Sequence, residues 1–248
     1  PDTYKMLGQG DTEGVFQLES SGMKQVLVGL QPQNLEDVIA LISLYRPGPM
    51  DSIPTYLRNR HEPDKISYKT PQLAHILDVT NGCIVYQEQV MQIFRELAGF
   101  SFGQADNVRR AMSKKKHAVM EAEREHFVHG CTEPGHECPG CVANGIPEQV
   151  ANQIYDEMSS FASYAFNKSH AACYAYVAFQ TAYLKCHYPS EFMAALLTSV
   201  LDNTDKVIEY SGECARLGIK VLPPDVNVSG GGFTADENGQ IRFGLNAV

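Results

Sequence analysis

The feature that most constrains this chain is the segment 161–185, FASYAFNKSHAACYAYVAFQTAYLK. One helix ends within this segment, a non-helical break follows, and a second helix begins near Ser169. The second helix is apolar or aromatic on every side from Ala171 to Phe179. A helix without a polar face belongs in the interior of a fold. We therefore expect a mainly helical protein in which this helix is buried.

The first turn of that helix is polar, with Asn167, Lys168, Ser169 and His170 in succession. Free backbone N–H groups and the positive end of the helix dipole lie at this position, so such a turn is typical of a phosphate site. The alternative is an ordinary N-cap, which Asn167 or Ser169 would provide without any ligand. A cap requires neither Lys168 nor His170, so we favour the anion site.

A second basic group is formed by Arg109 and Arg110, with lysines at 114–116 just beyond them. Arginine suits bidentate phosphate contact, and lysine suits looser charge contact. The alternative is a solvated helix face, which is what most charge runs are. The formal net charge of −9 argues against a simple DNA-coating protein. A basic face on an acidic body still indicates a nucleotide or nucleic acid as a partner.

A cysteine cluster follows in a Gly/Pro-rich loop at 126–146. Its pattern, C-x4-H-x-C-x2-C, is formed by Cys131, His136, Cys138 and Cys141. Three thiolates and an imidazole complete a tetrahedral structural zinc site, with His126 and His129 as rival fourth ligands. The alternative is a set of incidental cysteines in a loop. The other cysteines are scattered, as expected of reduced intracellular thiols.

Local signals predict helices along most of the chain and one hairpin near its end. Ser101 with Gln104 predicts a capping box, and Gly99 predicts a helix end. The stretch GGGFTADENGQIRFG predicts a β-hairpin that turns at Asn238-Gly239. Short strands are expected at 15–18 and 83–86, and a poorly ordered polar stretch at 58–69.

Composition and length set the domain organisation. With 248 residues, 44% of them hydrophobic, the chain can bury a proper core in one or two domains. We expect a helical domain at 1–222 and a β-hairpin segment at 223–248 that leads to a further domain. There is no apolar run long enough to span a membrane and no signal peptide, so we expect a cytoplasmic protein without a membrane partner. The chain lacks an initiator Met and stops within a strand pattern, as expected of a piece of a longer protein.

Six blocks of sequence carry a resemblance to a known family. In order, they are GVFQLESSGM (14–23), ALISLYRPGPM (40–50), IVYQEQVMQI (84–93), VRRAMSKKK (108–116), FNKSHAACYA (166–175) and HYPSEFMAALLTS (187–199). They closely resemble the bacterial DNA polymerase III alpha subunit of polymerase family C, over nearly the whole chain. The blocks belong to the fingers domain of that family.

The resemblance implies that the two basic groups serve one ligand, the incoming deoxynucleoside triphosphate (dNTP). The residues it implicates in nucleotide binding are Arg109, Arg110, Asn167, Lys168, Ser169, His170, Tyr164 and Arg46. In this reading Arg109 and Arg110 grip the triphosphate, while Tyr164 and Phe166 lie near the base or sugar. The family often has glycine where this chain has Ser163 and Ala165, so the loop before Asn167 is expected to be stiffer.

The resemblance also implies what this chain lacks. The family binds catalytic Mg²⁺ through palm aspartates upstream of residue 1, and no acid here matches that motif, so we expect no catalytic residue in this chain. Primer-template DNA and other replicase subunits would be partners of the whole protein, the subunits through regions absent here. The alternative function is a non-catalytic, zinc-stapled helical module that only binds nucleic acid. Binding of free dNTP would separate the two.

Overall fold

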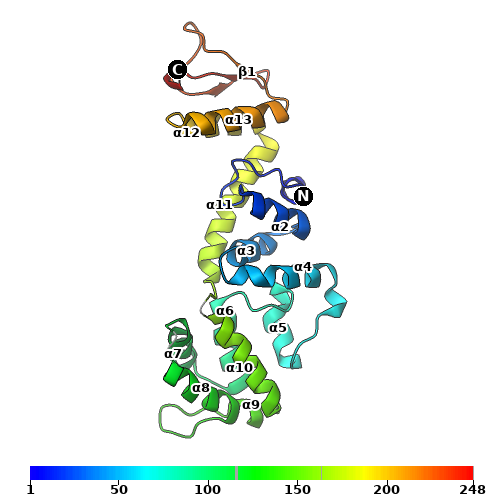
Figure 1. The fold of residues 1–248 in the computed structure, drawn as a ribbon, viewed down its shortest axis with the longest axis vertical. Helices are drawn as coiled ribbons and strands as arrows, with labels where there is room; N and C mark the ends of the chain where they lie inside the picture. Colours follow the sequence, from blue (N-terminus) through cyan, green and yellow to red (C-terminus); the bar gives the residue numbers. More distant parts are fainter. Residues whose placement is uncertain (115–116, 163, 248) are drawn as a thin grey trace. The chain divides into compact units, whose positions relative to one another are not determined.

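The structure is a computed structural model that describes residues 1–114, 117–162 and 164–247 (Figure 1). Helices make up most of it, and a small sheet lies near the C-terminal end, which confirms the mainly α class. Within these ranges no helix is long and apolar enough to cross a membrane. The chain divides into two compact units, Pro1–Leu35 with Tyr174–Val248, and Glu36–Cys173. The boundary expected at residue 222, between a helical domain and a β-hairpin segment, is based on a change in the sequence pattern. It stays a prediction.

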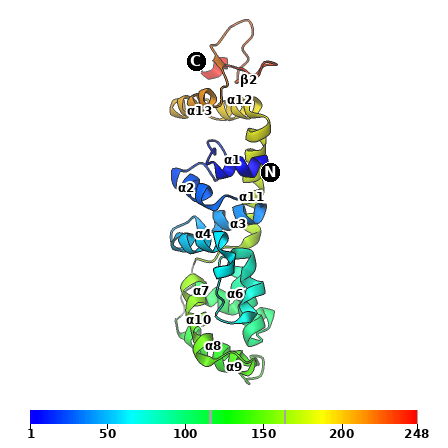
Figure 2. The ribbon, with the colours of Figure 1, turned by 90° about the vertical axis from the view of Figure 1, so that its right-hand side faces the viewer.

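The unit Glu36–Cys173 is an assembly of helices and short 3-10 turns. Its elements are α3 (Leu35–Leu44), η1 (Pro49–Ser52), α4 (Ile53–His61), η2 (Pro63–Lys65), η3 (Pro71–Leu73), α5 (Ala74–Leu77), η4 (Asp78–Thr80), α6 (Gln87–Ala98), α7 (Phe102–Ser113), α8 (His117–His129), α9 (Gly140–Ala143), α10 (Glu148–Ala162) and the start of α11 (Lys168–His187). Phe94, Phe127 and Tyr155, from α6, α8 and α10, form the centre of its core. Their ring centroids lie 5.0, 5.7 and 6.0 Å apart, distances typical of favourable aromatic pairs. Figure 2 shows α6 beside these helices.

A buried amide fixes the beginning of α6. Gln89 is 4% exposed, and its side-chain oxygen accepts hydrogen bonds from the N–H groups of Val85 and Tyr86, both at 2.9 Å. Its amide nitrogen donates to Thr80 Oγ1 at 2.7 Å and to the carbonyl of Ile76 at 3.1 Å. Because all of its hydrogen-bonding groups are used in the core, this side chain holds the first turn of α6 in one position.

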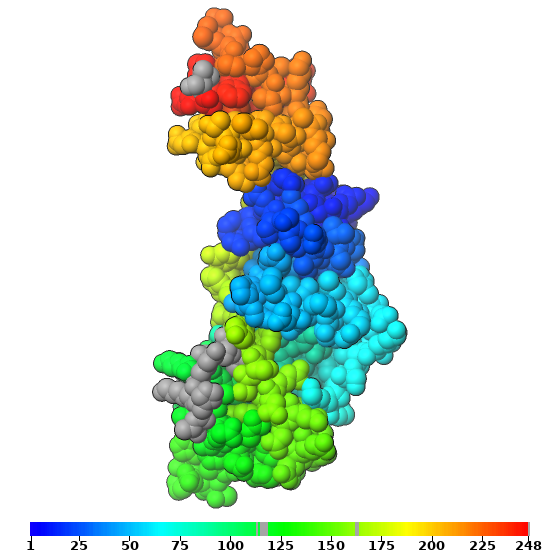
Figure 3. Space-filling model, in the orientation of Figure 1, coloured from blue at the N-terminus to red at the C-terminus, as the bar shows by residue number. Residues whose placement is uncertain are grey.

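The other unit contains both ends of the chain. Its elements are α1 (Asp2–Gly8), α2 (Ser21–Leu30), the rest of α11, α12 (Pro189–Ser199), α13 (Thr204–Arg216), β1 (Val221–Leu222), β2 (Thr234–Ala235), β3 (Ile241–Arg242) and η5 (Leu245–Ala247). Leu197 of α12, Cys214 of α13 and Ile241 of β3 are fully buried and belong to one core. In the space-filling view, the end of the chain forms one mass with α12 and α13 (Figure 3).

The predicted hairpin is present. β2 and β3 are antiparallel, and the turn between them contains Gly239 at φ +72°, a value that glycine adopts without strain. The Asp236 carboxylate accepts from the N–H groups of Asn238 and Gln240, both at 2.9 Å, as turn aspartates commonly do. The sequence did not predict β1, which pairs in parallel with β3 and gives the order β1-β3-β2.

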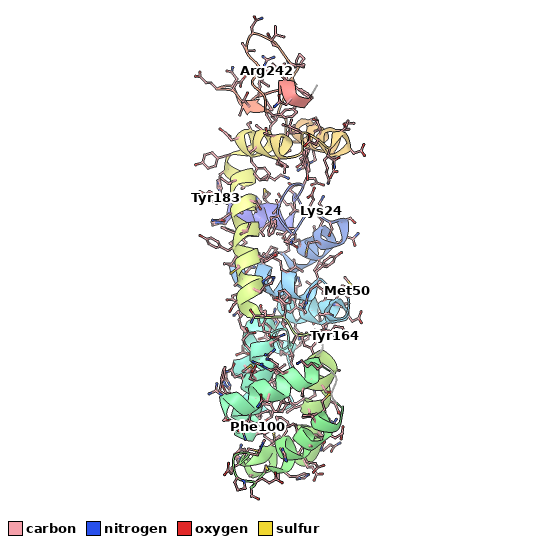
Figure 4. All side chains as sticks on the ribbon, turned by 90° about the vertical axis from the view of Figure 1, so that its left-hand side faces the viewer. Lys24, Met50, Phe100, Tyr164, Tyr183 and Arg242 are labelled. Atoms are coloured by element: carbon pink, nitrogen blue, oxygen red, sulfur yellow. The ribbon has the colours of Figure 1, made fainter. Side chains whose placement is uncertain are left out.

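The helix α11 corrects one expectation. A stripe of small residues, Ala171, Ala175, Ala178 and Ala182, is fully buried. Tyr176 is 57% exposed, Leu184 47% and Tyr183, labelled in Figure 4, 43%. The prediction of burial on every side is therefore wrong for one face. The alanines form the buried face of α11, while Tyr174 and Phe179 are half-buried and pack against Phe16 and Tyr4.

Some of the other expectations from the sequence are confirmed, and others are wrong. The Ser101–Gln104 capping box and the helix end at Gly99, with φ +75°, are confirmed. Residues 15–18 form turns rather than a strand, and 58–69 contains the end of α4 followed by η2. Residues 83–86 contribute one isolated bridge, from Tyr86 to Phe166, instead of a strand. Lys115, Lys116 and Ser163 lie outside the described residues.

A buried ion-pair network ties α11 to α13. Lys185 and Glu213 have side chains 1% and 4% exposed, and their charged atoms lie 2.8 Å apart. Lys185 also donates to the carbonyl of Glu13 at 2.8 Å, and Arg216 donates to both carboxylate oxygens of Glu213. Burial alone would raise the pKa of Glu213, but the hydrogen bonds from Arg216 and Lys185 outweigh it and lower that pKa.

Loss of one partner should therefore be costly. We expect Lys185→Met to lower the free energy of unfolding by about 3 kcal/mol, because Glu213 would stay buried with its charge incompletely compensated. Urea unfolding at pH 7 measures the change. Lys206→Met is the control: Lys206 also pairs with glutamates, but its side chain is 37% exposed, so its loss should cost under about 1 kcal/mol. Equal losses in the two variants would contradict the assignment.

Candidate functional site

A pocket of about 430 Å³ lies where α6, α7 and the residue preceding α11 meet. Acidic, basic, amide and apolar side chains line it: Gln87, Glu88, Met91, Gln92, Arg95, Glu96, Phe102, Asp106, Arg109 and Asn167. Two of the residues predicted to bind nucleotide, Arg109 and Asn167, thus share one cavity although they are far apart in the sequence. The structure places Arg110, Tyr164, Arg46 and the remaining first-turn residues outside that lining.

Arg109 is held in a fixed orientation. Its guanidinium donates to Asp106 Oδ1 at 3.0 and 2.7 Å and to Gln87 Oε1 at 2.9 Å. The hydrogen bond from Arg109 is the largest cause of a lowered pKa at Asp106. Arg110 contacts the other oxygen of Asp106 at 2.7 Å, but its side chain is 66% exposed. One carboxylate therefore orients both arginines.

A short stretch of paired backbone brings the start of α11 to the pocket. Phe166 donates to the carbonyl of Val85 at 3.2 Å and accepts from the N–H of Gln87 at 2.9 Å. The Gln87 side chain donates to the carbonyl of Ala165 at 3.0 Å while its oxygen accepts from Arg109. Gln87 thus bridges the two groups of residues that the sequence singled out.

The first turn of α11 is capped from two directions. Asn167 Oδ1 accepts from the N–H of His170 at 2.9 Å, so the N-cap interpretation is correct for this residue. Glu88 accepts from the Asn167 amide at 3.0 Å and from the N–H of Lys168 at 3.1 and 3.2 Å. Ser169 is exposed, and the ring of His170 packs against Phe166 with centroids 5.3 Å apart.

Lys168 points to a different group of residues. Its Nζ lies 3.0 Å from Glu36 Oε2 and 5.3 Å from the centre of the Tyr86 ring. Tyr86 is 1% exposed, and its hydroxyl has no hydrogen-bond partner among the described residues. The ammonium group is therefore engaged away from the pocket lining, although its backbone N–H is bound to Glu88.

Arg46 supports the loop before α11. Its guanidinium donates to the carbonyl of Tyr164 at 2.8 Å and stacks 4.1 Å from the centre of the Phe166 ring. Burial lowers its pKa. Gly48, at φ +102°, allows Tyr164 to approach, because a Cβ there would lie 2.5 Å from the tyrosine ring. In Figure 4 Tyr164 is the labelled residue of this loop. Arg46 therefore orders the loop that carries Phe166 and Asn167.

Among the residues that were not singled out from the sequence, three connect the two basic groups. They are Gln87, Glu88 and Asp106, and no local pattern distinguishes them from ordinary helix residues. The available signal was the block IVYQEQVMQI, which contains Gln87 and Glu88 and carried only the family resemblance.

The cysteine cluster does not form a ligand set. Cys131 and Cys138 exchange two backbone hydrogen bonds of 2.9 Å, and Cys138 Sγ donates to the carbonyl of His126 at 3.6 Å. Cys141 is fully buried, and burial raises the pKa of its thiol to about 12. His136 lines a separate small hollow with His126 and Glu123. Among the described residues, no group of three or more His, Cys, Asp or Glu side chains is placed to hold a metal, so the residues do not fit zinc in this arrangement.

Zinc at this loop stays a prediction that rests on spacing alone. The spacing predicts one zinc ion per chain. It also predicts that a strong chelator removes this ion and disorders residues 126–146. Elemental analysis of protein purified without chelators measures it. Metal-free protein whose melting temperature does not respond to chelator would contradict zinc and match the packed thiols described above.

Comparisons with known proteins show the family to which the chain belongs. A family model for the bacterial DNA polymerase III alpha subunit finger domain matches residues 1–135, and a helix-hairpin-helix motif matches residues 218–248. The described part of this second segment forms the small sheet and η5. The chain belongs to the family of the DNA polymerase III alpha subunit finger domain.

Relatives match along the chain's length. The DNA polymerase III subunit alpha of Thermus aquaticus is 51% identical over 100% of the chain. That of Bacillus subtilis is 47% identical over 99%, and that of Staphylococcus aureus 46% identical over 91%. The chain spans about a fifth of the length of these relatives, 20%, 21% and 20% respectively.

Proposed function

We propose that this chain binds the triphosphate of an incoming deoxynucleotide and positions it for template-directed synthesis by a whole DNA-directed DNA polymerase. The observation that carries the proposal is the pocket shared by Arg109 and Asn167, with Gln87 bonded to both sides. The likeness to polymerase subunits supports it, because a polymerase requires a site for nucleotide. We also propose that this enzyme works in the cytoplasm.

Each group has a defined role in this proposal. Arg109 donates to two phosphate oxygens in its fixed plane, and Gln87 keeps that plane oriented. The start of α11 supplies the side-chain amide of Asn167 and the backbone N–H of Lys168, and the helix dipole adds positive charge there, with Ser169 and His170 in the same turn. Tyr164, held by Arg46, faces the base or sugar. Magnesium, held by carboxylates outside this chain, would activate the primer hydroxyl.

Positioning is the main contribution that protein side chains make to phosphoryl transfer. A triphosphate fixed at several points presents its reacting phosphorus in one orientation, which lowers the entropic part of the barrier. Charged donors aimed at its oxygens also stabilise charge in the transition state. The helix-hairpin-helix segment at 218–248 supports primer-template DNA as the second partner of the whole protein. The alternative, a zinc-stapled binding module, has no support among the described side chains.

The role of Arg109 can be measured in the intact polymerase. We expect Arg109→Ala to lower kcat/KM for nucleotide roughly 10- to 100-fold, because charge-assisted hydrogen bonds to phosphate are lost. Primer-template affinity should stay within about twofold. Arg124→Ala is the matched control, since Arg124 is also ion-paired, to Asp156 at 2.7 Å, but lies on α8 outside the pocket. Equal losses of DNA and nucleotide affinity would move Arg109 to the duplex backbone instead.

The chain by itself should make no DNA. No acid here matches the palm motif implied by the family, and without bound metal the primer hydroxyl is a weak nucleophile. A primer-extension assay on the purified chain, with the intact polymerase as positive control, tests this expectation. Template-dependent incorporation by the chain alone would contradict it.

A further inference from the structure

Glu88 occupies the position at which a phosphate would meet α11. Both of its carboxylate oxygens accept hydrogen bonds there, from the Lys168 N–H at 3.1 and 3.2 Å and from the Asn167 amide at 3.0 Å. A helix N-terminus stabilises negative charge, whether that charge belongs to a ligand or to a side chain. In this structure the charge belongs to the protein.

The contact lies inside the proposed binding pocket. Glu88 and Asn167 both line the cavity that contains Arg109. Three acidic residues, Glu88, Glu96 and Asp106, line it against two arginines, so the ligand-free pocket has no excess of positive charge. An anion entering the pocket gains the donors of α11 only if the Glu88 carboxylate leaves them.

Departure of Glu88 is feasible. The residue is exposed, and a solvated carboxylate can rotate into water without a large desolvation cost. The remaining cap does not depend on it, because Asn167 Oδ1 bonds to the N–H of His170 independently. The start of α11 would therefore stay helical when the Lys168 N–H and the Asn167 amide exchange Glu88 for a ligand.

We propose that Glu88 is an internal competitor of the triphosphate, which lowers the affinity of the nucleotide site and speeds release of its polyphosphate product. This inference rests on the proposed function. It makes Glu88 a residue that sets affinity without contacting the ligand. Every polyphosphate that reaches the start of α11 must displace the same carboxylate, so the same penalty applies to substrate and product.

The test uses the intact polymerase with dNTP as substrate and inorganic pyrophosphate as inhibitor. We expect Glu88→Gln to lower the KM for dNTP and the inhibition constant of pyrophosphate by the same factor, about threefold, because a neutral amide competes less well for a helix N-terminus. Glu88→Asp keeps the charge but is one methylene shorter. It should give the same direction of change, since the shorter side chain reaches α11 poorly.

Glu96→Gln is the matched control. Glu96 lies on the same helix and lines the same pocket, but it contacts Gln92 and His75 instead of α11. It should change both constants less than Glu88→Gln does. Equal effects of the two Gln variants would overturn the proposal in favour of a general field effect. An increase in both constants for Glu88→Gln would overturn it in favour of a purely supporting role.

Two experimental outcomes separate an error in the proposed binding site from an error in the role of Glu88. If Arg109→Ala leaves nucleotide kinetics unchanged, the proposed binding site is wrong, and the inference about Glu88 is wrong with it. If Arg109→Ala impairs nucleotide use while Glu88→Gln leaves both constants unchanged, the site is correct and Glu88 is not a competitor.

Discussion

The backbone pairing of Phe166 with Val85 and Gln87 is the interaction on which the candidate site depends. It joins the residues that precede two helices, so that α6 and α11 begin beside each other. Two positive helix ends at one place repel each other and leave several N–H groups without partners within their helices. Glu88 accepts from the N–H of Lys168 on α11, while Gln87 donates to the carbonyl of Ala165 in the preceding loop, and the pocket forms around this junction. Negative charge is therefore favoured at this junction, whether a side chain or a ligand supplies it.

Features encoded by a few neighbouring residues could be predicted from the sequence. The Ser101–Gln104 capping box, the helix end at Gly99 and the hairpin around Gly239 each depend on residues within four or five positions. Their hydrogen bonds are nearly independent of the rest of the fold. The polar first turn of α11 belongs to the same class, since the cap at Asn167 is local.

Features decided by tertiary packing could not be predicted in the same way. The composition of α11 shows no polar face, and only the fold reveals that the alanines are buried while Tyr176 and Leu184 are exposed. Spacing identified the cysteines, but whether thiols face one ion or the core depends on the surrounding helices. Likewise, Gln87 and Asp106 are unremarkable in sequence and become central only because Arg109 lies between them.

The buried network of Lys185, Glu213 and Arg216 has a consequence for how the chain responds to heat. The free-energy cost of removing charged groups from water falls as temperature rises, while hydrophobic stabilisation per unit area levels off. The contribution of this network should therefore grow on warming, relative to that of the apolar core beside it. The link between α11 and α13 would then be among the last contacts of its unit to weaken at high temperature. The C-terminal half of α11 would therefore stay attached to α13 while other contacts of the unit loosen.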